Sequence, residues 1–202
     1  VQPDRIRELQ APDEGRVLRR DGGNLASVIA GLESPEGRET KDRILEYLKR
    51  VVPGIDDFGA KRIGHMETIE FLQAVEGAER PWRFPANNMS DGTLRALALL
   101  VALFQGSERT RVSLVCIEEP EAALHPAAAR VLRDCILEAS ERVQVLVTSH
   151  SADLLDDATI GADMIRAVVA EANRSAIGRV SEATRSSLRD HLFTAGELLR
   201  IQ

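Results

Sequence analysis

The pattern of hydrophobic and polar positions changes character near Asn88. Before this point it predicts short helices and then short antiparallel strands, preceded by a charged, turn-rich arm or edge strand over residues 1–23. The helices expected here are 25–32, with Asn24 as N-cap, and one capped by Thr40 that ends near Val52, and the expected strands are 61–64, 68–75 and 82–84.

After Asn88, short apolar runs alternate with helix-like segments. The segment 91–105 is apolar nearly all round, so we expect it to be a buried helix. Strands without a polar face, joined through helices, indicate a parallel sheet covered on both sides. The other elements expected are strands over 113–117, 143–148, 164–170 and 176–180, and helices from Pro126 to about 140 and over 152–156, 182–192 and 196–200.

These patterns predict an α/β fold with parallel core strands flanked by helices and a helical and antiparallel N-terminal portion. Residues 1–88 would lead into a core of residues 89–202, within a single incomplete domain. A hydrophobic content of 44% and a charged content of 29% are ordinary for a soluble globular protein. The net charge of −6 argues against a chain coated for nucleic acid, although it leaves room for a local basic patch.

The two cysteines, Cys116 and Cys135, fit no metal-ligand spacing, and we expect two reduced, buried thiols. The sequence has no signal peptide and no apolar run approaching about 18 residues, so we expect no membrane span and a cytoplasmic location.

Two apolar runs end in polar groups that suit nucleotide hydrolysis. The run 113–117 leads into Glu118 and Glu119, and the run ending at Thr148 is followed by Ser149 and His150. Hydrolysis requires a carboxylate near Mg²⁺ and a second carboxylate that orients the attacking water. A bare pair of glutamates is usually a solvated strand end, but here Pro-Glu-Ala-Ala-Leu-His-Pro follows directly, and the combination is far more specific.

A second candidate is the segment 88–95, Asn-Met-Ser-Asp-Gly-Thr-Leu-Arg, which precedes the buried helix. Ser90 and Asp91 suit a helix cap, and Gly92 permits close approach to the backbone. The first amides of such a helix are unpaired donors that attract an anion. Taken alone, an ordinary N-cap would explain the segment equally well.

Together these segments resemble ABC-type ATPases, in the branch that includes RecF, the OLD family, SMC heads and AAA-type predicted ATPases. The segment 113–126, SLVCIEEPEAALHP, resembles the Walker B strand and D-loop, and 88–95 resembles the signature motif, with Asp91 and Thr93 replacing Gly and Gln. His150 matches the switch histidine. The three occur in the order of the family and near its usual spacing.

The resemblance implies a partial P-loop NTPase fold and roles for individual residues. Glu118 would support Mg²⁺, Glu119 would be the catalytic carboxylate, and His150 would sense the γ-phosphate and the water. ATP held by an opposing protomer would contact the signature residues, and Ala123, Leu124 and His125 would lie in the D-loop at the dimer interface. The nucleotide-binding set implied in this way is Ser90, Asp91, Gly92 and His125.

A phosphate-binding loop is not found in these residues, because no lysine is followed by Ser or Thr. We therefore expect the C-terminal part of an ATPase head, inactive alone, whose Walker A lobe lies on the same or another chain. The expected partners are that lobe, a second copy joined through ATP, and DNA or an effector protein.

Three functions remain open at this point. The first is an ABC-type ATPase in DNA maintenance or antiviral defence, an output that rests on family analogy. The second is a catalytically incomplete interaction or dimerisation module. The third is a metal-dependent nuclease, which the lack of an Asp-x-Asp motif disfavours.

Overall fold

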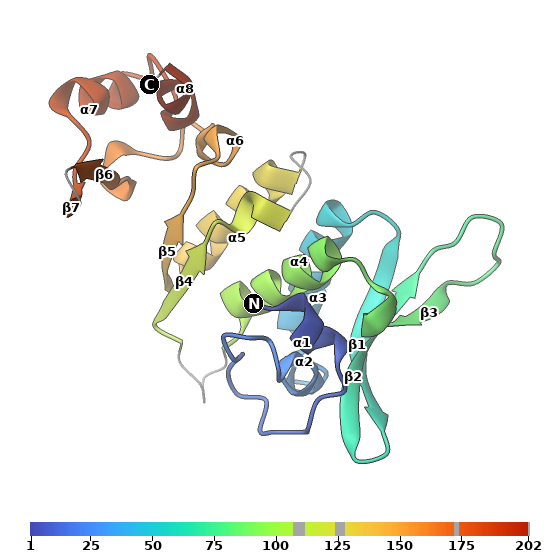
Figure 1. The fold of residues 1–202 in the computed structure, drawn as a ribbon. Coiled ribbons are helices and arrows are strands. Elements are labelled where there is room, and N and C mark those ends of the chain that lie inside the picture. Colours follow the sequence, from blue (N-terminus) through green and yellow to red (C-terminus); the bar gives the residue numbers. More distant parts are fainter. Residues whose placement is uncertain (107–111, 124–127, 172–173, 202) are drawn as a thin grey trace. The chain divides into compact units, whose positions relative to one another are not determined.

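The computed structural model describes residues 1–106, 112–123, 128–171 and 174–201 (Figure 1). The chain forms two compact units, Val1–Thr148 and Ser149–Gln202. The change near Asn88 falls inside the first unit, and the division of the sequence at that point stays a prediction. The α/β class is confirmed, because parallel strands joined through a helix accompany antiparallel strands and further helices.

The core of the first unit is built around α4 (Asp91–Phe104), which is buried as predicted. Leu94, Leu97 and Val101 are fully buried, and α3 (Arg38–Val51) and α5 (Ala129–Ser140) pack against the helix. The apolar character of α4 on nearly every side therefore reflects neighbours on several sides.

Of the two predicted helix caps, Asn24 occupies the N-cap position without a capping side-chain bond, and Thr40 is wrong. The helix α2 (Leu25–Leu32) follows Asn24, but the Asn24 side chain donates to the Val17 carbonyl and accepts from the Arg19 amide. This side chain fastens the N-terminal arm instead of capping the helix. The other helix, α3, begins at Arg38 after Gly37, so Thr40 lies inside its first turn.

An antiparallel sheet covers α2 and α3 in the order β1-β2-β3, as the short strands of the sequence predicted. Strand β1 (Ile55–Ile63) pairs with β2 (Met66–Gln73), and β2 pairs with β3 (Trp82–Pro85). The buried side chains of this sheet are Ile55, Phe58, Ile69 and Phe71. A 3₁₀ turn, η1 (Ala86–Asn88), then carries the chain from β3 to the start of α4.

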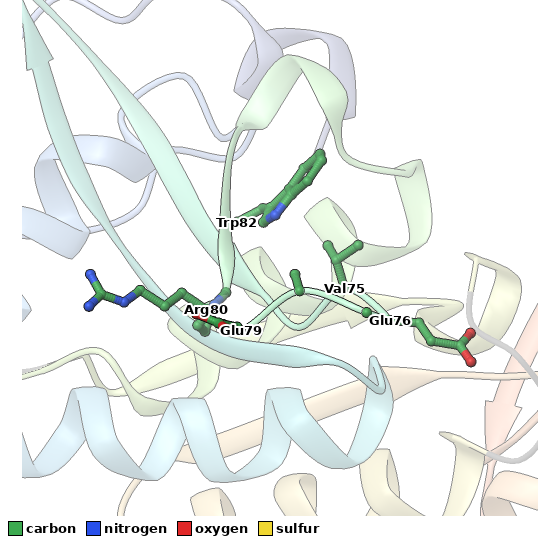
Figure 2. Close-up of a pocket in the computed structure, with 8 residues that line it drawn as sticks. Val75, Glu76, Glu79, Arg80 and Trp82 are labelled. Atoms are coloured by element: carbon green, nitrogen blue, oxygen red, sulfur yellow. The ribbon is translucent and has the colours of Figure 1, made fainter.

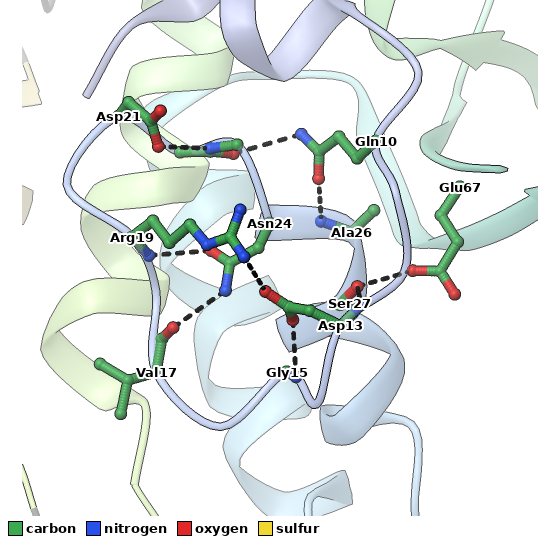
Figure 3. A network of polar contacts seen from close by, with 12 residues as sticks. Gln10, Asp13, Gly15, Val17, Arg19, Asp21, Asn24, Ala26, Ser27 and Glu67 are labelled. Carbon is green, nitrogen blue, oxygen red and sulfur yellow. Dashed lines mark hydrogen bonds and ion pairs between the residues drawn. The ribbon is translucent and has the colours of Figure 1, made fainter.

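The N-terminal arm is more ordered than the sequence predicted. It opens with a short helix, α1 (Pro3–Arg7), which packs beside η1 and the start of α4. The backbone of Gln10 then pairs with that of Glu67, and the Gln10 side chain accepts from the Ala26 amide at 2.9 Å (Figure 3). In the same network the Ser27 hydroxyl donates to Glu67 at 2.8 Å. The arm is thus fixed to α2 and to β2.

Strands β4 (Leu114–Glu118) and β5 (Gln144–Thr148) form a parallel pair joined through α5. Their alternate residues Val115, Ile117 and Val145 pack against the helical core. The opposite face is exposed at Leu114, Cys116 and Leu146, so in the described residues the helices cover one face and not both, contrary to prediction. Of the two cysteines, Cys135 is buried as expected, whereas Cys116 is exposed.

The second unit contains α6 (Ala152–Leu155), η4 (Ala162–Met164), β6 (Ala167–Glu171), β7 (Arg174–Gly178), α7 (Glu182–Arg189) and α8 (Ala195–Ile201). The strands β6 and β7 pair antiparallel with each other. The prediction that they belong to a parallel sheet is therefore wrong. Arg200 on α8 forms ion pairs with Asp153 and Asp156. A Cβ at Gly196 would lie 2.2 Å from the Ala152 carbonyl oxygen, so α6 and α8 require glycine at this contact.

The helices of the described ranges include none that is long and apolar enough to cross a membrane.

Candidate functional site

The signature segment forms a capped helix start at the surface. Ser90 is the N-cap of α4, and its hydroxyl oxygen accepts from the Thr93 amide at 3.2 Å and lies 2.9 Å from the Thr93 hydroxyl. Thr93 is buried, whereas Ser90 and Asp91 are exposed. The cap predicted at Ser90 is confirmed, and it lies at a helix end whose first amides have no partner within the helix.

Arg7 is a residue of this segment that the sequence did not indicate. Its guanidinium forms an ion pair with Asp91, donates to the Met89 carbonyl at 2.9 Å and contacts Asp4 at 3.1 Å. The hydrogen bond to Asp91 raises the pKa of Arg7 above its ordinary value. Because 84 residues separate Arg7 from Asp91, no local pattern could have shown the contact.

The carboxylate pair lies where β4 ends. Glu118 is the last residue of the strand, opposite Thr148 of β5, and its side chain is exposed. Strand alternation places it on the same face as Leu114 and Cys116. The predicted metal ligand therefore lies on the uncovered face of the sheet.

Glu119 has a backbone φ of 43°, in the left-handed region that residues other than glycine rarely adopt. Its amide donates to the Thr148 carbonyl at 2.9 Å, and its carbonyl accepts from the Ala122 amide at 3.0 Å, in the turn η2 (Pro120–Ala123). This conformation costs about 1–2 kcal/mol for a residue with a Cβ. A strained residue directly after a parallel strand is typical of a functional position.

The predicted switch histidine, His150, follows β5 by two residues and is exposed. It belongs to the second compact unit, whereas Glu118 and Glu119 belong to the first. Ser151, the next residue, caps α6 by accepting from the Leu154 amide at 3.2 Å.

The other D-loop residues predicted, Leu124 and His125, lie outside the described residues. Among the residues that the structure describes, no group of three or more His, Cys, Asp or Glu side chains is arranged to hold a metal ion. A single carboxylate such as Glu118 still fits Mg²⁺, because this ion is usually held by one or two carboxylates together with substrate phosphates and water.

A hollow between β2 and β3 is lined by residues 75–82 (Figure 2). Figure 2 shows that Glu76 and Arg80 extend away from it in opposite directions. Trp82 is 57% exposed at its edge. None of the predicted site residues lines this hollow, so it is separate from the candidate ATP site.

The sequence matches a family described as "AAA domain, putative AbiEii toxin, Type IV TA system" over residues 19–157. The chain belongs to this AAA-domain family. The matched range contains the signature segment, the carboxylate pair and His150. The expectation of an AAA-type ATPase domain is therefore confirmed. Among curated proteins none matches.

Solved structures of SMC heads share the fold. A chain from a study of "ATP-driven dimerization and DNA stimulated activation of SMC ATPases" is 16% identical, with a TM-score of 0.51 over 77% of this chain and 91% of that one. The Smc head bound to the C-winged helix domain of ScpA is 16% identical, with a TM-score of 0.55 over 92% of this chain and 55% of that one.

A third similar structure is the Smc head domain with a coiled coil and joint from Pyrococcus yayanosii. It is 17% identical, with a TM-score of 0.51, and the match covers 77% of this chain but only 29% of that one. At these identities the likeness shows the fold alone. The protein is thus an AAA ATPase-like domain with an SMC-head fold.

Proposed function

We propose that this chain is the signature-to-switch part of an ABC-type ATPase, which hydrolyses ATP with Mg²⁺ at an interface between two heads. The observation that carries the proposal is the strained backbone of Glu119 directly after β4. Backbone strain persists mainly at functional positions, and here it falls on the residue that the Walker B resemblance makes the catalytic carboxylate. The exposed cap at Ser90 belongs to the second expected motif, the signature segment.

Each motif residue has a distinct role in this proposal. Glu118 provides one oxygen ligand, and the bound Mg²⁺ would neutralise charge on the phosphates. Glu119 orients the attacking water and accepts its proton, and His150 senses the γ-phosphate from the adjoining loop. Ser90 and the amides that follow it bind the γ-phosphate of ATP held by the opposing protomer.

The phosphate-holding half of the site lies on another segment or chain in this proposal. The exposed apolar face at Leu114, Cys116 and Leu146 supports it, because parallel strands are ordinarily covered on both faces. The packing lobe would bring a glycine-rich loop with a lysine. DNA maintenance or antiviral defence is the output that we propose for the assembled ATPase.

The test compares Glu119→Gln and Glu118→Gln in the native protein. We expect Glu119→Gln to lower the rate of ATP hydrolysis by about a hundredfold or more while ATP-dependent dimerisation persists, since only proton transfer is lost. Glu118→Gln should instead raise the Mg²⁺ concentration needed for activity. Glu141→Gln, an exposed carboxylate at the end of α5, is the matched control.

Two outcomes would contradict the proposal. Native protein that neither hydrolyses ATP nor dimerises with it would refute the ATPase assignment. ATP-dependent dimerisation without turnover, unchanged in Glu119→Gln, would instead identify the interaction module as the function.

A further inference from the structure

The ion pair between Arg7 and Asp91 deepens the function proposed above and rests on it. We propose that Arg7 is a positioning residue of the nucleotide site: its guanidinium neutralises the Asp91 carboxylate and fixes the signature segment, so that this segment accepts the triphosphate of ATP from the opposing protomer. The substrate class is thus a polyanion, bound beside a carboxylate that requires a counter-charge.

The first step of the argument is electrostatic. Asp91 is the first residue of α4, where the exposed amides and the helix dipole attract an anion. The carboxylate satisfies that field when no ligand is bound, but its charge repels a phosphate arriving at the same helix end. A cation paired with Asp91 removes much of this repulsion and leaves the amides available.

The second step is geometric. Arg7 donates to the carbonyl of Met89 at 2.9 Å and pairs with Asp91, so one guanidinium holds the residues on both sides of Ser90. Both contacts are made by Nη2, while Nη1 of the same planar group contacts Asp4 at 3.1 Å. A lysine ammonium, which has a single nitrogen, reproduces this set of three contacts less well. Arg7 therefore restrains the backbone that presents the Ser90 hydroxyl.

The third step is the anchoring of Arg7 itself. Its helix, α1, is fixed by the buried residues Pro3 and Ile6, and the Gln2 amide donates to the Asp21 carbonyl at 3.0 Å. The Arg7 side chain is 25% exposed, against 61% for Asp91. The guanidinium is consequently held in position before any nucleotide binds, and little ordering remains to be done on binding.

A purely structural clamp is the competing explanation. A partly exposed ion pair contributes little to stability, and its loss would weaken the fold without a specific effect on nucleotide. The two explanations differ when the charge of Asp91 is removed. If Arg7→Ala weakens ATP binding because Asp91 then repels the phosphates, adding Asp91→Asn should restore the binding. If Arg7→Ala acts only by loosening the fold, adding Asp91→Asn should not restore it.

The experiment measures half-saturating ATP for hydrolysis, together with ATP-dependent dimerisation by light scattering, in the native protein. We expect Arg7→Ala to raise the half-saturating ATP concentration about tenfold with little change in kcat. The reason is that the negative charge of Asp91 near the phosphates is no longer neutralised. The double variant Arg7→Ala with Asp91→Asn should return to within about threefold of wild type, and Arg7→Lys should lie between, since it keeps the charge but not the fork.

Arg5→Ala is the matched control, because Arg5 lies on the same helix and forms an ion pair with the exposed Glu8. Circular dichroism melts without ATP verify that each variant folds. A double variant as impaired as Arg7→Ala, or Arg7→Ala equal to wild type, would overturn the proposal. Wild-type protein without any response to ATP would refute the proposed function itself. That result comes from the wild-type measurement, whereas failure of the Arg7 proposal appears only in the variants.

Discussion

The hydroxyl oxygens of Ser90 and Thr93 lie 2.9 Å apart at the start of α4, and the Thr93 amide donates to Ser90 at 3.2 Å. Ser181 and Thr184 form the same arrangement at the start of α7, with the same two distances. The chain therefore contains two caps of equal geometry, of which only the first lies in the signature segment. Substitutions at both caps can therefore distinguish the effect of losing a helix cap from an effect on nucleotide binding.

Substitution of Ser90 should affect stability and nucleotide binding in different ways. Ser90→Ala removes the cap and should lower the free energy of unfolding by about 1 kcal/mol. Ser90→Asp keeps a good cap, so stability should stay within about 0.5 kcal/mol of wild type, but a new negative charge at the anion site should abolish ATP-dependent dimerisation. Urea denaturation and light scattering measure the two effects.

The matched variants Ser181→Ala and Ser181→Asp should reproduce the stability changes and leave dimerisation unaltered, because this cap lies on α7. Normal ATP-dependent dimerisation in Ser90→Asp would contradict the role given to the signature segment.

The left-handed backbone of Glu119 predicts a stability difference between two inactive variants. Both Glu119→Gly and Glu119→Ala lose the carboxylate, but glycine adopts a φ of 43° without steric cost. Glycine also has greater conformational freedom in the unfolded chain, which offsets part of this advantage. Glu119→Gly should therefore be more stable than Glu119→Ala by about 0.5–1 kcal/mol in urea denaturation.

His191, whose φ is 53°, provides the control pair, since it lies outside the predicted site. His191→Gly and His191→Ala should differ in the same direction. A Glu119→Ala variant that equals Glu119→Gly in stability would show that the backbone of Glu119 relaxes, and that no strain is stored there.

The sequence predicted those parts of the molecule that depend on local pattern. The buried helix α4, the cap at Ser90 and the paired strands before and after α5 follow from apolar periodicity and from the preferences of Ser at helix starts. The order of the motifs then identified the family, which the match over residues 19–157 confirms.

Contacts between distant residues were beyond sequence reasoning. Asn24 is a typical N-cap residue, yet its side chain binds the arm at Val17 and Arg19, because tertiary hydrogen bonds outweigh a local preference. Arg7 likewise reaches Asp91 only because α1 packs beside α4. The exposed face at Cys116 could not be predicted, since an apolar run does not reveal which of its faces is covered.

A carboxylate between α3 and α5 predicts a pH dependence of stability. Glu138 accepts hydrogen bonds from Arg43 and, at 2.6 Å, from the Tyr47 hydroxyl. The hydrogen bond from Arg43 holds the pKa of Glu138 below its ordinary 4.5, although partial burial opposes this shift. Because the folded pKa is lowered, the stabilisation is present above the unfolded value and is lost as the pH falls through the folded one.

Glu138→Gln should therefore lower the free energy of unfolding by about 1 kcal/mol at pH 7, a modest effect for a partly exposed pair. The difference from wild type should shrink as the pH falls below 4.5, measured by urea denaturation at several pH values. Glu46→Gln, which removes the more exposed partner of Arg43, should have a smaller effect. A difference that stays constant down to pH 3 would contradict the assignment.

The two cysteines predict selective alkylation. Cys135 is fully buried in α5, and burial raises the pKa of its thiol, so its reactive thiolate is scarce in the native state. Cys116 is exposed on the uncovered face of β4. Iodoacetamide at pH 8 should therefore modify Cys116 in the folded chain, and should modify Cys135 only when the domain unfolds. Peptide mass spectrometry distinguishes the two sites.

The same reaction tests whether another lobe covers this face. If a phosphate-binding lobe packs on β4 and β5, Cys116 should react more slowly in the assembled protein than in the chain of residues 1–202, because the lobe excludes the reagent. Cys116→Ser should remove the fast label, and Cys135→Ser should leave it unchanged. Equal reactivity of Cys116 in the assembly and in the isolated chain would show that the face stays open, and would argue against a lobe packed there.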